Sequence, residues 1–235
     1  MTSSGSDFPQ LALDFRWDQS SDLACFVSQG NEEAVEAIHA LETPQAPWLF
    51  LHGPPGCGKT HLLHAACTQR GREGKAAVYV SLTDHRGGSP GLLEGLEQVP
   101  LVAIDDLHQV AGRPEWEEAI FHAYNRLRDA GGQLVVAAER PPAGLEMALP
   151  DLVSRLQAML SLRLTPPDDE RRRCILQQAA RRRGLHLPPE SVNYLLSREA
   201  RDLSHLMALM DRLDAASLRS ARRLTVPFVR EVLAG

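Results

Sequence analysis

Short apolar runs alternate with stretches of helical periodicity over the first two thirds of the chain. Five runs are apolar almost throughout, which is typical of strands buried on both faces of a sheet. They cover residues 48–52, 77–81, 101–104, 133–138 and 159–164. Helical patterns separate the runs, such as residues 116–128, which are followed by the terminating pair Gly131–Gly132. Strands that alternate with helices predict an α/β fold, with a parallel sheet covered by helices on both faces.

The residues before the first run divide into an irregular segment and one helix. Residues 1–22 are mostly polar and show no periodicity, so we expect a flexible tail there. Asn31 is a favourable N-cap residue, and Glu32 and Glu33 suit the positive end of a helix dipole. A helix is therefore predicted to begin after Asn31 and to end before Pro44.

The strand signal ends at Leu164, and the rest of the chain has helical patterns. Residues 165–167, Thr-Pro-Pro, mark a junction before an acidic helix start. Helices are predicted over residues 168–183, 189–197, 202–219 and 226–233. We therefore expect three parts, which are the tail 1–22, an α/β domain over 23–164 and a small helical domain over 165–235.

The net charge differs in sign between the first two thirds of the chain and the rest. Of 235 residues, 43% are hydrophobic and 23% charged, which is ordinary for a folded protein. The net charge of −5 is uneven, because residues 1–164 carry −9 and residues 165–235 carry +4. The arginines at 171–173 and 181–183 are expected on solvated faces, although a contact with DNA phosphates would give the same pattern.

The cysteines and the N-terminus exclude two classes of protein. The four cysteines lie far apart and form no CxxC pair, so we interpret them as reduced thiols rather than a disulfide scaffold. The N-terminus lacks a basic start, and no run approaches about 20 consecutive apolar residues. We therefore expect a cytoplasmic protein without a signal peptide or a membrane span.

One glycine-rich segment matches the GxxxxGK(S/T) pattern of phosphate-binding loops. It consists of Gly53, Pro54, Pro55, Gly56, Cys57, Gly58, Lys59 and Thr60. The segment follows a predicted strand and precedes a predicted helix that starts at His61, which is the context that such a loop needs. Its backbone N–H groups would hold phosphates, Lys59 would reach the β- and γ-phosphates, and Thr60 would bind Mg²⁺. The sequence therefore predicts ADP or ATP with Mg²⁺, and we include His61 among the nucleotide-binding residues.

Two adjacent carboxylates complete the predicted nucleotide site. Asp105 and Asp106 follow the apolar run 101–104, which we expect to be a strand neighbouring that of the loop. Asp105 is predicted to support Mg²⁺ together with Thr60, and Asp106 to orient the attacking water. The Asp106 side chain is shorter than the Glu common in fast ATPases of this type. No HExxH or GxSxG motif is present, so protease and hydrolase templates do not apply.

Several longer segments carry a family resemblance. GPPGCGKTHLLHAA, LVAIDDLHQVAG, WEEAIFHAYNRLRDAGGQLVVAAERPP, DLVSRL and LTVPFVREVL together resemble the DnaA-type AAA+ ATPases over nearly the whole chain. The resemblance implies an AAA+ P-loop ATPase with a parallel central sheet and a helical lid. Within this group, the N-terminal QLALDF and the ending at Gly235 are most similar to regulatory inactivators of the initiator DnaA. An initiator continues into a helix-turn-helix domain, so sequence-specific DNA binding is not expected here.

The resemblance also implies roles for single residues. Arg155 matches the arginine finger, which points at nucleotide held by a neighbouring subunit. Arg201 matches the sensor-two arginine, and Phe26 and Val27 match the segment that lines the adenine pocket. Glu139 stands at the sensor-one position in place of a shorter Asp.

The hexapeptide at the N-terminus is similar to a ligand of the bacterial sliding clamp, the β subunit of DNA polymerase III. Its candidate contact residues are Gln10, Leu11, Leu13 and Phe15.

The expected function is an adaptor that docks on the DNA-loaded clamp and stimulates hydrolysis of ATP bound to DnaA, which prevents re-initiation. Such a protein would mainly activate its partner's hydrolysis, as a monomer or a homodimer. The alternatives are a DnaC-like loader that remodels a helicase through its own ATP turnover, and a DnaA-domain protein that bridges DnaA and another partner.

Overall fold

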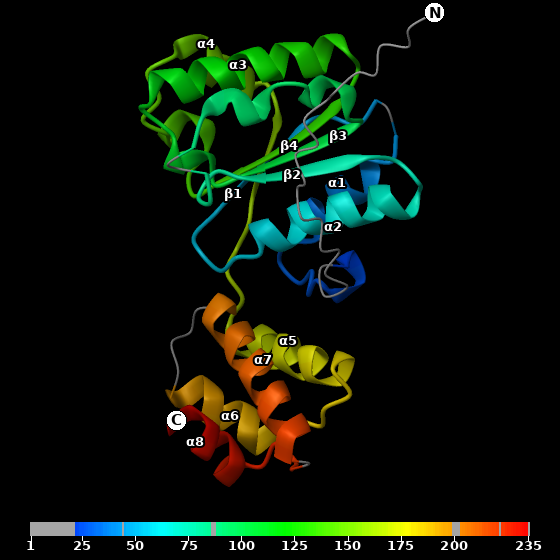
Figure 1. The fold of residues 1–235 in the computed structure, drawn as a ribbon, viewed down its shortest axis with the longest axis vertical. Helices are drawn as coiled ribbons and strands as arrows, with labels where there is room; N and C mark the ends of the chain where they lie inside the picture. The colour runs from blue at the N-terminus through cyan, green and yellow to red at the C-terminus, as the bar shows by residue number, and fades with distance from the viewer. Residues whose placement is uncertain (1–21, 44, 86–87, 199–202, 221, 235) are drawn as a thin grey trace, which may run out of the picture.

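The computed structural model describes residues 22–43, 45–85, 88–198, 203–220 and 222–234. An α/β part and a helical part are joined by a short connection (Figure 1). The strands lie where the apolar runs predict them, and all of them are parallel. They are β1 (Leu49–His52), β2 (Ala77–Ser81), β3 (Leu101–Asp105), β4 (Gln133–Ala138) and β5 (Leu160–Arg163). The α/β fold class is confirmed.

The sheet has the strand order β2-β3-β4-β1-β5. Strand β4 therefore lies between β1 and β3, and the expectation that the strand of Asp105 directly neighbours that of the glycine-rich loop is wrong. Because all strands are parallel, the carboxyl ends of β1, β3 and β4 still meet at one edge of the sheet. The groups that follow these three strands are brought together at that edge.

Helices cover both faces of the sheet (Figure 1). α1 (Glu32–Ala40) and α2 (Lys59–Arg72) pack on one face, with Leu49 and Leu51 of β1. α3 (Pro114–Asp129) and α4 (Pro150–Gln157) pack on the other, with Phe50 of the same strand. The alternation of neighbouring side chains along β1 thus supplies two hydrophobic cores. The sequence pattern does not predict α4.

Short 3-10 helices complete the connections. They are η2 (Leu23–Cys25), η3 (Pro90–Leu93), η4 (Leu96–Gln98), η5 (Leu107–Gln109) and η6 (Pro142–Gly144). None of the helices among the described residues is long and apolar enough to cross a lipid bilayer.

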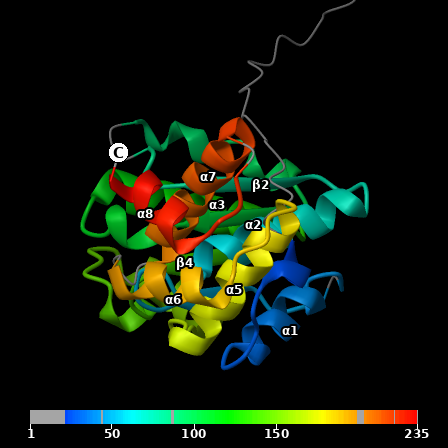
Figure 2. The same cartoon turned by 90° about the horizontal axis from the view of Figure 1, so that it is seen from below.

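The C-terminal helices form a separate small bundle around a core of their own. They are α5 (Asp169–Arg182), α6 (Pro189–Arg198), α7 (Leu203–Ser220) and α8 (Val226–Ala234), close to the predicted limits. Leu176, Leu195, Met210 and Phe228 are among its buried residues. Seen from below, these helices lie in front of α2 and the sheet, while α1 lies to one side (Figure 2).

Asn31 holds the junction between the two parts rather than capping α1. It occupies the N-cap position, but its side chain makes no capping hydrogen bond, so the predicted cap is wrong. Its amide instead donates to the Thr165 carbonyl at 3.1 Å, and its Oδ1 accepts from the Thr165 backbone N–H at 2.8 Å. These two bonds tie the start of α1 to the segment that leads into the helical bundle.

Arg171 extends the same junction. Its guanidinium donates to the backbone carbonyls of Gln29 at 2.6 Å and Pro166 at 2.9 Å. The side chain is only 12% exposed, and that of Arg172 is only 14% exposed. The expectation of solvated faces is therefore wrong for these two arginines, which bond backbone carbonyls and a neighbouring carboxylate. It is also wrong for Arg183, whose side chain is 19% exposed and donates to the Ala179 carbonyl and to Asp211.

Replacing Asn31 by Ala is expected to lower the free energy of unfolding by about 2 kcal/mol. Asn31 is 7% exposed, and without its side chain the Thr165 carbonyl and the Thr165 N–H both lose their hydrogen-bond partner. Urea denaturation would measure the change, with Glu33→Ala on the exposed side of α1 as control. A change below about 0.5 kcal/mol, the range of ordinary surface substitutions, would contradict the assigned role.

Candidate nucleotide-binding site

The glycine-rich loop connects β1 to α2 in a conformation that requires glycine at position 58. Gly58 has φ +99°, and a Cβ there would lie 2.6 Å from Cε2 of the Phe26 ring. The loop leads directly into α2, whose N-terminus carries the positive end of a helix dipole. A close backbone turn at a helix N-terminus is an arrangement that binds phosphate.

Lys59, the first residue of α2, is a buried cation without a charged partner. Its Nζ donates to the carbonyls of Gly53 at 2.8 Å and Pro54 at 3.1 Å, and the residue is only 7% exposed. Among the described residues no carboxylate pairs with it. Because a desolvated ammonium is costly unless an anion is close, this position fits a phosphate ligand.

Thr60 and Asp105 form an oxygen-rich pair beside the loop. Thr60 Oγ1 donates to Asp105 Oδ2 at 2.6 Å, and the Tyr79 hydroxyl donates to the same oxygen at 3.0 Å. Asp105 is only 1% exposed, and its other oxygen accepts from the Asp106 backbone N–H at 2.9 Å. Burial, together with the negative charge of Asp105, raises the pKa of Tyr79. Hydroxyl and carboxylate oxygens are the ligands that Mg²⁺ prefers, so this pair fits the predicted metal.

Asp106 and Glu139 bring two further carboxylates to the same place. Asp106 has a left-handed backbone with φ 57°, and its Oδ2 accepts from Thr83 Oγ1 at 2.7 Å. Glu139 directly follows β4, and its Oε1 lies 3.3 Å from Nε2 of His108. Asp106 and Glu139 line a cavity of about 410 Å³ together with Lys59 and residues of the loop. Thr60 lines the same cavity, while the buried Asp105 lies behind it and is bonded to Thr60.

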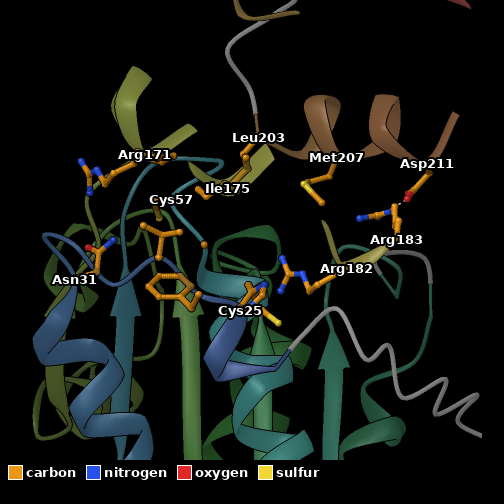
Figure 3. A pocket seen from close by; sticks show the side chains of 15 residues that line it. Cys25, Asn31, Cys57, Arg171, Ile175, Arg182, Arg183, Leu203, Met207 and Asp211 are labelled. Carbon is orange, nitrogen blue, oxygen red and sulfur yellow. Dashed lines mark hydrogen bonds and ion pairs between the residues drawn. The ribbon is translucent and has the colours of Figure 1, made fainter. Parts of the chain in front are cut away.

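A second cavity of about 220 Å³ adjoins the first between the loop and the helical bundle. Figure 3 shows Leu203 and Met207 facing it from α7, with Cys25 on the opposite wall. Phe26, Val27 and His61 also line it. Its lining combines these apolar side chains with polar and charged ones, among them Arg182 and Asp211, and such a mixture suits a planar heterocyclic base.

His61 connects the loop helix to the N-terminal segment. Its Nε2 lies 3.2 Å from the Asp22 carbonyl, and its ring centroid lies 5.6 Å from that of Phe26. His61 lines both cavities, as does Gly58. These contacts place the first turn of α2 between the two parts of the site.

Among the described residues, the predicted Arg155 does not join these cavities. Arg155 lies on α4, across the sheet from α2, and lines neither cavity. Within the part of the chain that the structure describes, its side chain makes no hydrogen bond or ion pair with another residue. Arg201 and the hexapeptide residues lie outside the described residues. The latter are Gln10, Leu11, Leu13 and Phe15.

Sequence reasoning missed several residues that build the site. Tyr79 lies within β2 and Thr83 follows it by two residues, and β2 is the neighbour of β3 in the sheet. A polar residue at the end of an adjacent parallel strand would have been a usable signal if the strand order had been known. Leu203 and Met207 carry no such signal, because only the placement of the helical bundle brings them to the cavities.

Comparisons with known proteins agree with this geometry. Residues 168–233 match a family model described as the lid domain of Hda, and residues 89–163 match that of the bacterial DnaA ATPase domain. Domain III of the Thermotoga maritima replication initiation protein DnaA is similar, with a TM-score of 0.77 and 25% identity over 92% of this chain and 97% of that one.

Two further solved structures share the fold. AMPPCP-bound DnaA from Aquifex aeolicus has a TM-score of 0.70 and 24% identity, over 87% of this chain and 68% of that one. The RuvB Holliday junction branch migration motor of Thermotoga maritima has a TM-score of 0.64 and 17% identity, over 89% and 69%. The sheet, the loop and the helical bundle are thus arranged as in AAA+ proteins.

Proposed function

Because the chain is a DnaA-family AAA+ protein with an Hda-type lid domain, we propose that it regulates the initiation of DNA replication in a nucleotide-bound form. The ligand is ADP or ATP with Mg²⁺. The single observation that carries the nucleotide ligand is Lys59, a buried ammonium at a helix N-terminus that donates to two carbonyl oxygens and the Cys57 sulfur and pairs with no carboxylate among the described residues. Such a group needs an anion, and a phosphate chain supplies one.

Different residues of the site would contact the phosphates, the metal and the base of the nucleotide. Lys59 and the loop backbone would hold the phosphates, and Thr60 and Asp105 would hold the metal. Bound Mg²⁺ would neutralise phosphate charge. Phe26, Val27 and the lid residues around the smaller cavity would enclose the base. Closure of the lid on these groups would then depend on the nucleotide.

The protein acts on its partner's nucleotide rather than chiefly on its own. Arg155 lies on α4 away from the cavities of this chain, with a partly exposed side chain that is not bonded within the described residues. A guanidinium in that position is available to ATP held by a second protein, which we propose is DnaA. There it would offset charge that develops in the transition state.

The N-terminal hexapeptide supplies the second contact of this adaptor. We propose that Gln10, Leu11, Leu13 and Phe15 dock in an apolar pocket of the DNA-loaded sliding clamp. The clamp would then hold the protein in the cytoplasm at the chromosome, where DnaA is inactivated after initiation. The support for this step is the sequence similarity of the hexapeptide to clamp ligands.

The test is the rate at which DnaA-bound ATP is hydrolysed when this protein is added, with and without DNA-loaded clamp. The adaptor function predicts strong stimulation that requires loaded clamp. Tight ADP binding without any stimulation would reject it and favour a loader that turns over its own ATP. Stimulation that is equal with and without clamp would reject the docking step alone.

Replacing Phe15 by Ala is expected to weaken clamp binding about 30-fold, because a buried aromatic anchor contributes about 2 kcal/mol. Affinity for ADP should stay within twofold of the unchanged protein. Surface plasmon resonance on immobilised clamp would measure the first, and nucleotide titration the second. Trp17→Ala, two residues beyond the hexapeptide, is the matched control, and an equal loss in both variants would argue against the motif.

A further inference from the structure

Glu117 is a fully buried carboxylate in the first turns of α3. Its exposed fraction is 0%, and within the described residues it forms no ion pair with an arginine, lysine or histidine. Its neighbour Glu118 on the same helix is exposed. A buried charge without a counter-ion is costly, so its surroundings must supply strong hydrogen bonds.

Three backbone N–H groups from two distant segments supply these bonds. Glu117 Oε1 accepts from Gly112 at 2.6 Å and from Ala148 at 3.1 Å. Its Oε2 accepts from Leu149 at 2.7 Å. Both oxygens are therefore used, and one side chain joins the loop before α3 to the segment before α4.

The first of these segments leads back to the nucleotide site. Gly112 follows η5, which itself begins directly after Asp105 and Asp106. Asp106 lines the larger cavity and Asp105 bonds Thr60. Glu117 thus contacts the loop that follows Asp105 and Asp106 of this chain's own site.

The second segment is the start of α4, the helix of Arg155. Leu149 occupies the N-cap position of α4 but offers no side-chain cap, and Pro150 follows it. Two buried leucines hold one face of this short helix against the core. The Glu117 carboxylate binds the two amides that precede the helix and thereby fixes where α4 begins.

We infer that Glu117 is a positioning residue for Arg155, an inference that rests on the proposed function of Arg155 toward the ATP of DnaA. By bonding Gly112 and Leu149 at once, Glu117 fixes the Arg155 helix relative to the loop that follows Asp105 and Asp106. Orientation of a reacting group within a fraction of an ångström strongly affects rate, so a loosened α4 reduces turnover more than it reduces docking.

The test replaces Glu117 by Gln, which keeps the size of the side chain but turns one acceptor oxygen into an NH₂ donor. The maximal stimulated rate of hydrolysis of DnaA-bound ATP is expected to fall about tenfold. The concentration that gives half-maximal stimulation and the affinity for ADP should both stay within twofold. Hydrogen exchange should become faster in peptides covering residues 148–157 and stay unchanged in those covering α5. Glu118→Gln is the matched control and should change none of these quantities.

The outcomes separate this inference from the function on which it rests. An unchanged maximal rate in Glu117→Gln, while Arg155→Ala abolishes stimulation, overturns the role of Glu117 and leaves the proposed function intact. A fall in rate with a proportional loss of ADP affinity also overturns it, because Glu117 would then support the fold generally. If the unsubstituted protein does not stimulate DnaA at all, the proposed function fails and the inference falls with it.

Discussion

Replacing Lys59 by Ala is expected to weaken the binding of ADP and ATP at least 100-fold. Lys59 is the only lysine in the phosphate cavity, and charge-assisted hydrogen bonds contribute about 1.5–3 kcal/mol each. Two such bonds to phosphate oxygens give about 3–6 kcal/mol, and each 1.4 kcal/mol is tenfold in affinity. Titration with a fluorescent nucleotide analogue, or calorimetry with ADP, would measure the loss.

The same substitution should leave the nucleotide-free protein about as stable as before. The Lys59 ammonium is nearly buried and contacts two carbonyls and the Cys57 sulfur but no carboxylate among the described residues, so its removal also removes a desolvation cost. We expect the free energy of unfolding without nucleotide to change by less than about 1 kcal/mol, while stabilisation by added ADP is lost. Lys75→Ala removes the other lysine of the chain, which is exposed and paired with Glu73, and should affect neither quantity. ADP affinity within tenfold of normal in Lys59→Ala would refute the assigned site.

Much of the fold could be predicted because buried parallel strands are marked by continuous apolar runs. The limits of β2 and β4 agree with the sequence pattern residue by residue. Helix α4 could not be predicted in the same way, because its eight residues include only two fully buried side chains, Leu152 and Leu156. So short a segment offers no repeated periodicity to detect.

The order of the strands could not be predicted, because an apolar run marks a strand but not its neighbours. The phosphate loop could be recognised since its residues are contiguous and its chemistry is local. Tyr79 and Thr83 could not, since they reach Asp105 and Asp106 only through the pairing of β2 with β3. Residues that the sheet assembles were thus visible only in the structure.

At two positions, contacts between distant segments determine a side chain's hydrogen-bond partners, which the local sequence does not predict. Asn31 has the residue type and the acidic neighbours expected of an N-cap, yet its side chain bonds Thr165, which is 134 residues away. Glu117 and Glu118 are neighbours in the sequence, and helical spacing puts only Glu117 on the stripe with Ile120 and Tyr124, but nothing local predicts the partners of its carboxylate. Two of the three backbone bonds that Glu117 accepts come from residues 148 and 149, about 30 residues further along the chain, and the third comes from Gly112.

Replacing Arg155 by Ala is expected to reduce the stimulated hydrolysis of DnaA-bound ATP by about 10³-fold or more, to the rate of DnaA alone. A guanidinium delivered in trans to a phosphoryl group contributes about 10³ to 10⁵ in rate. Clamp binding and ADP affinity should be unchanged, because Arg155 lies on α4 and lines neither cavity. Single-turnover hydrolysis of labelled ATP on DnaA, with loaded clamp in excess, would measure the effect.

The control must remove an arginine from the same surface. Arg128 lies in the last turn of α3, which packs with α4 on the same face of the sheet, and its side chain is exposed. Arg128→Ala makes the same change in net charge and should retain full stimulation. Loss in both variants would indicate that general electrostatic attraction between the proteins is the cause.

Arg155→Lys then distinguishes charge from geometry. Lysine keeps the charge but loses the planar fork that binds two phosphate oxygens at once, so we expect no more than a few per cent of the stimulated rate. Near-normal stimulation by the lysine variant would mean that position 155 contributes charge alone. In that case the precise orientation of α4 would matter little, and the tenfold effect expected of Glu117→Gln should disappear as well.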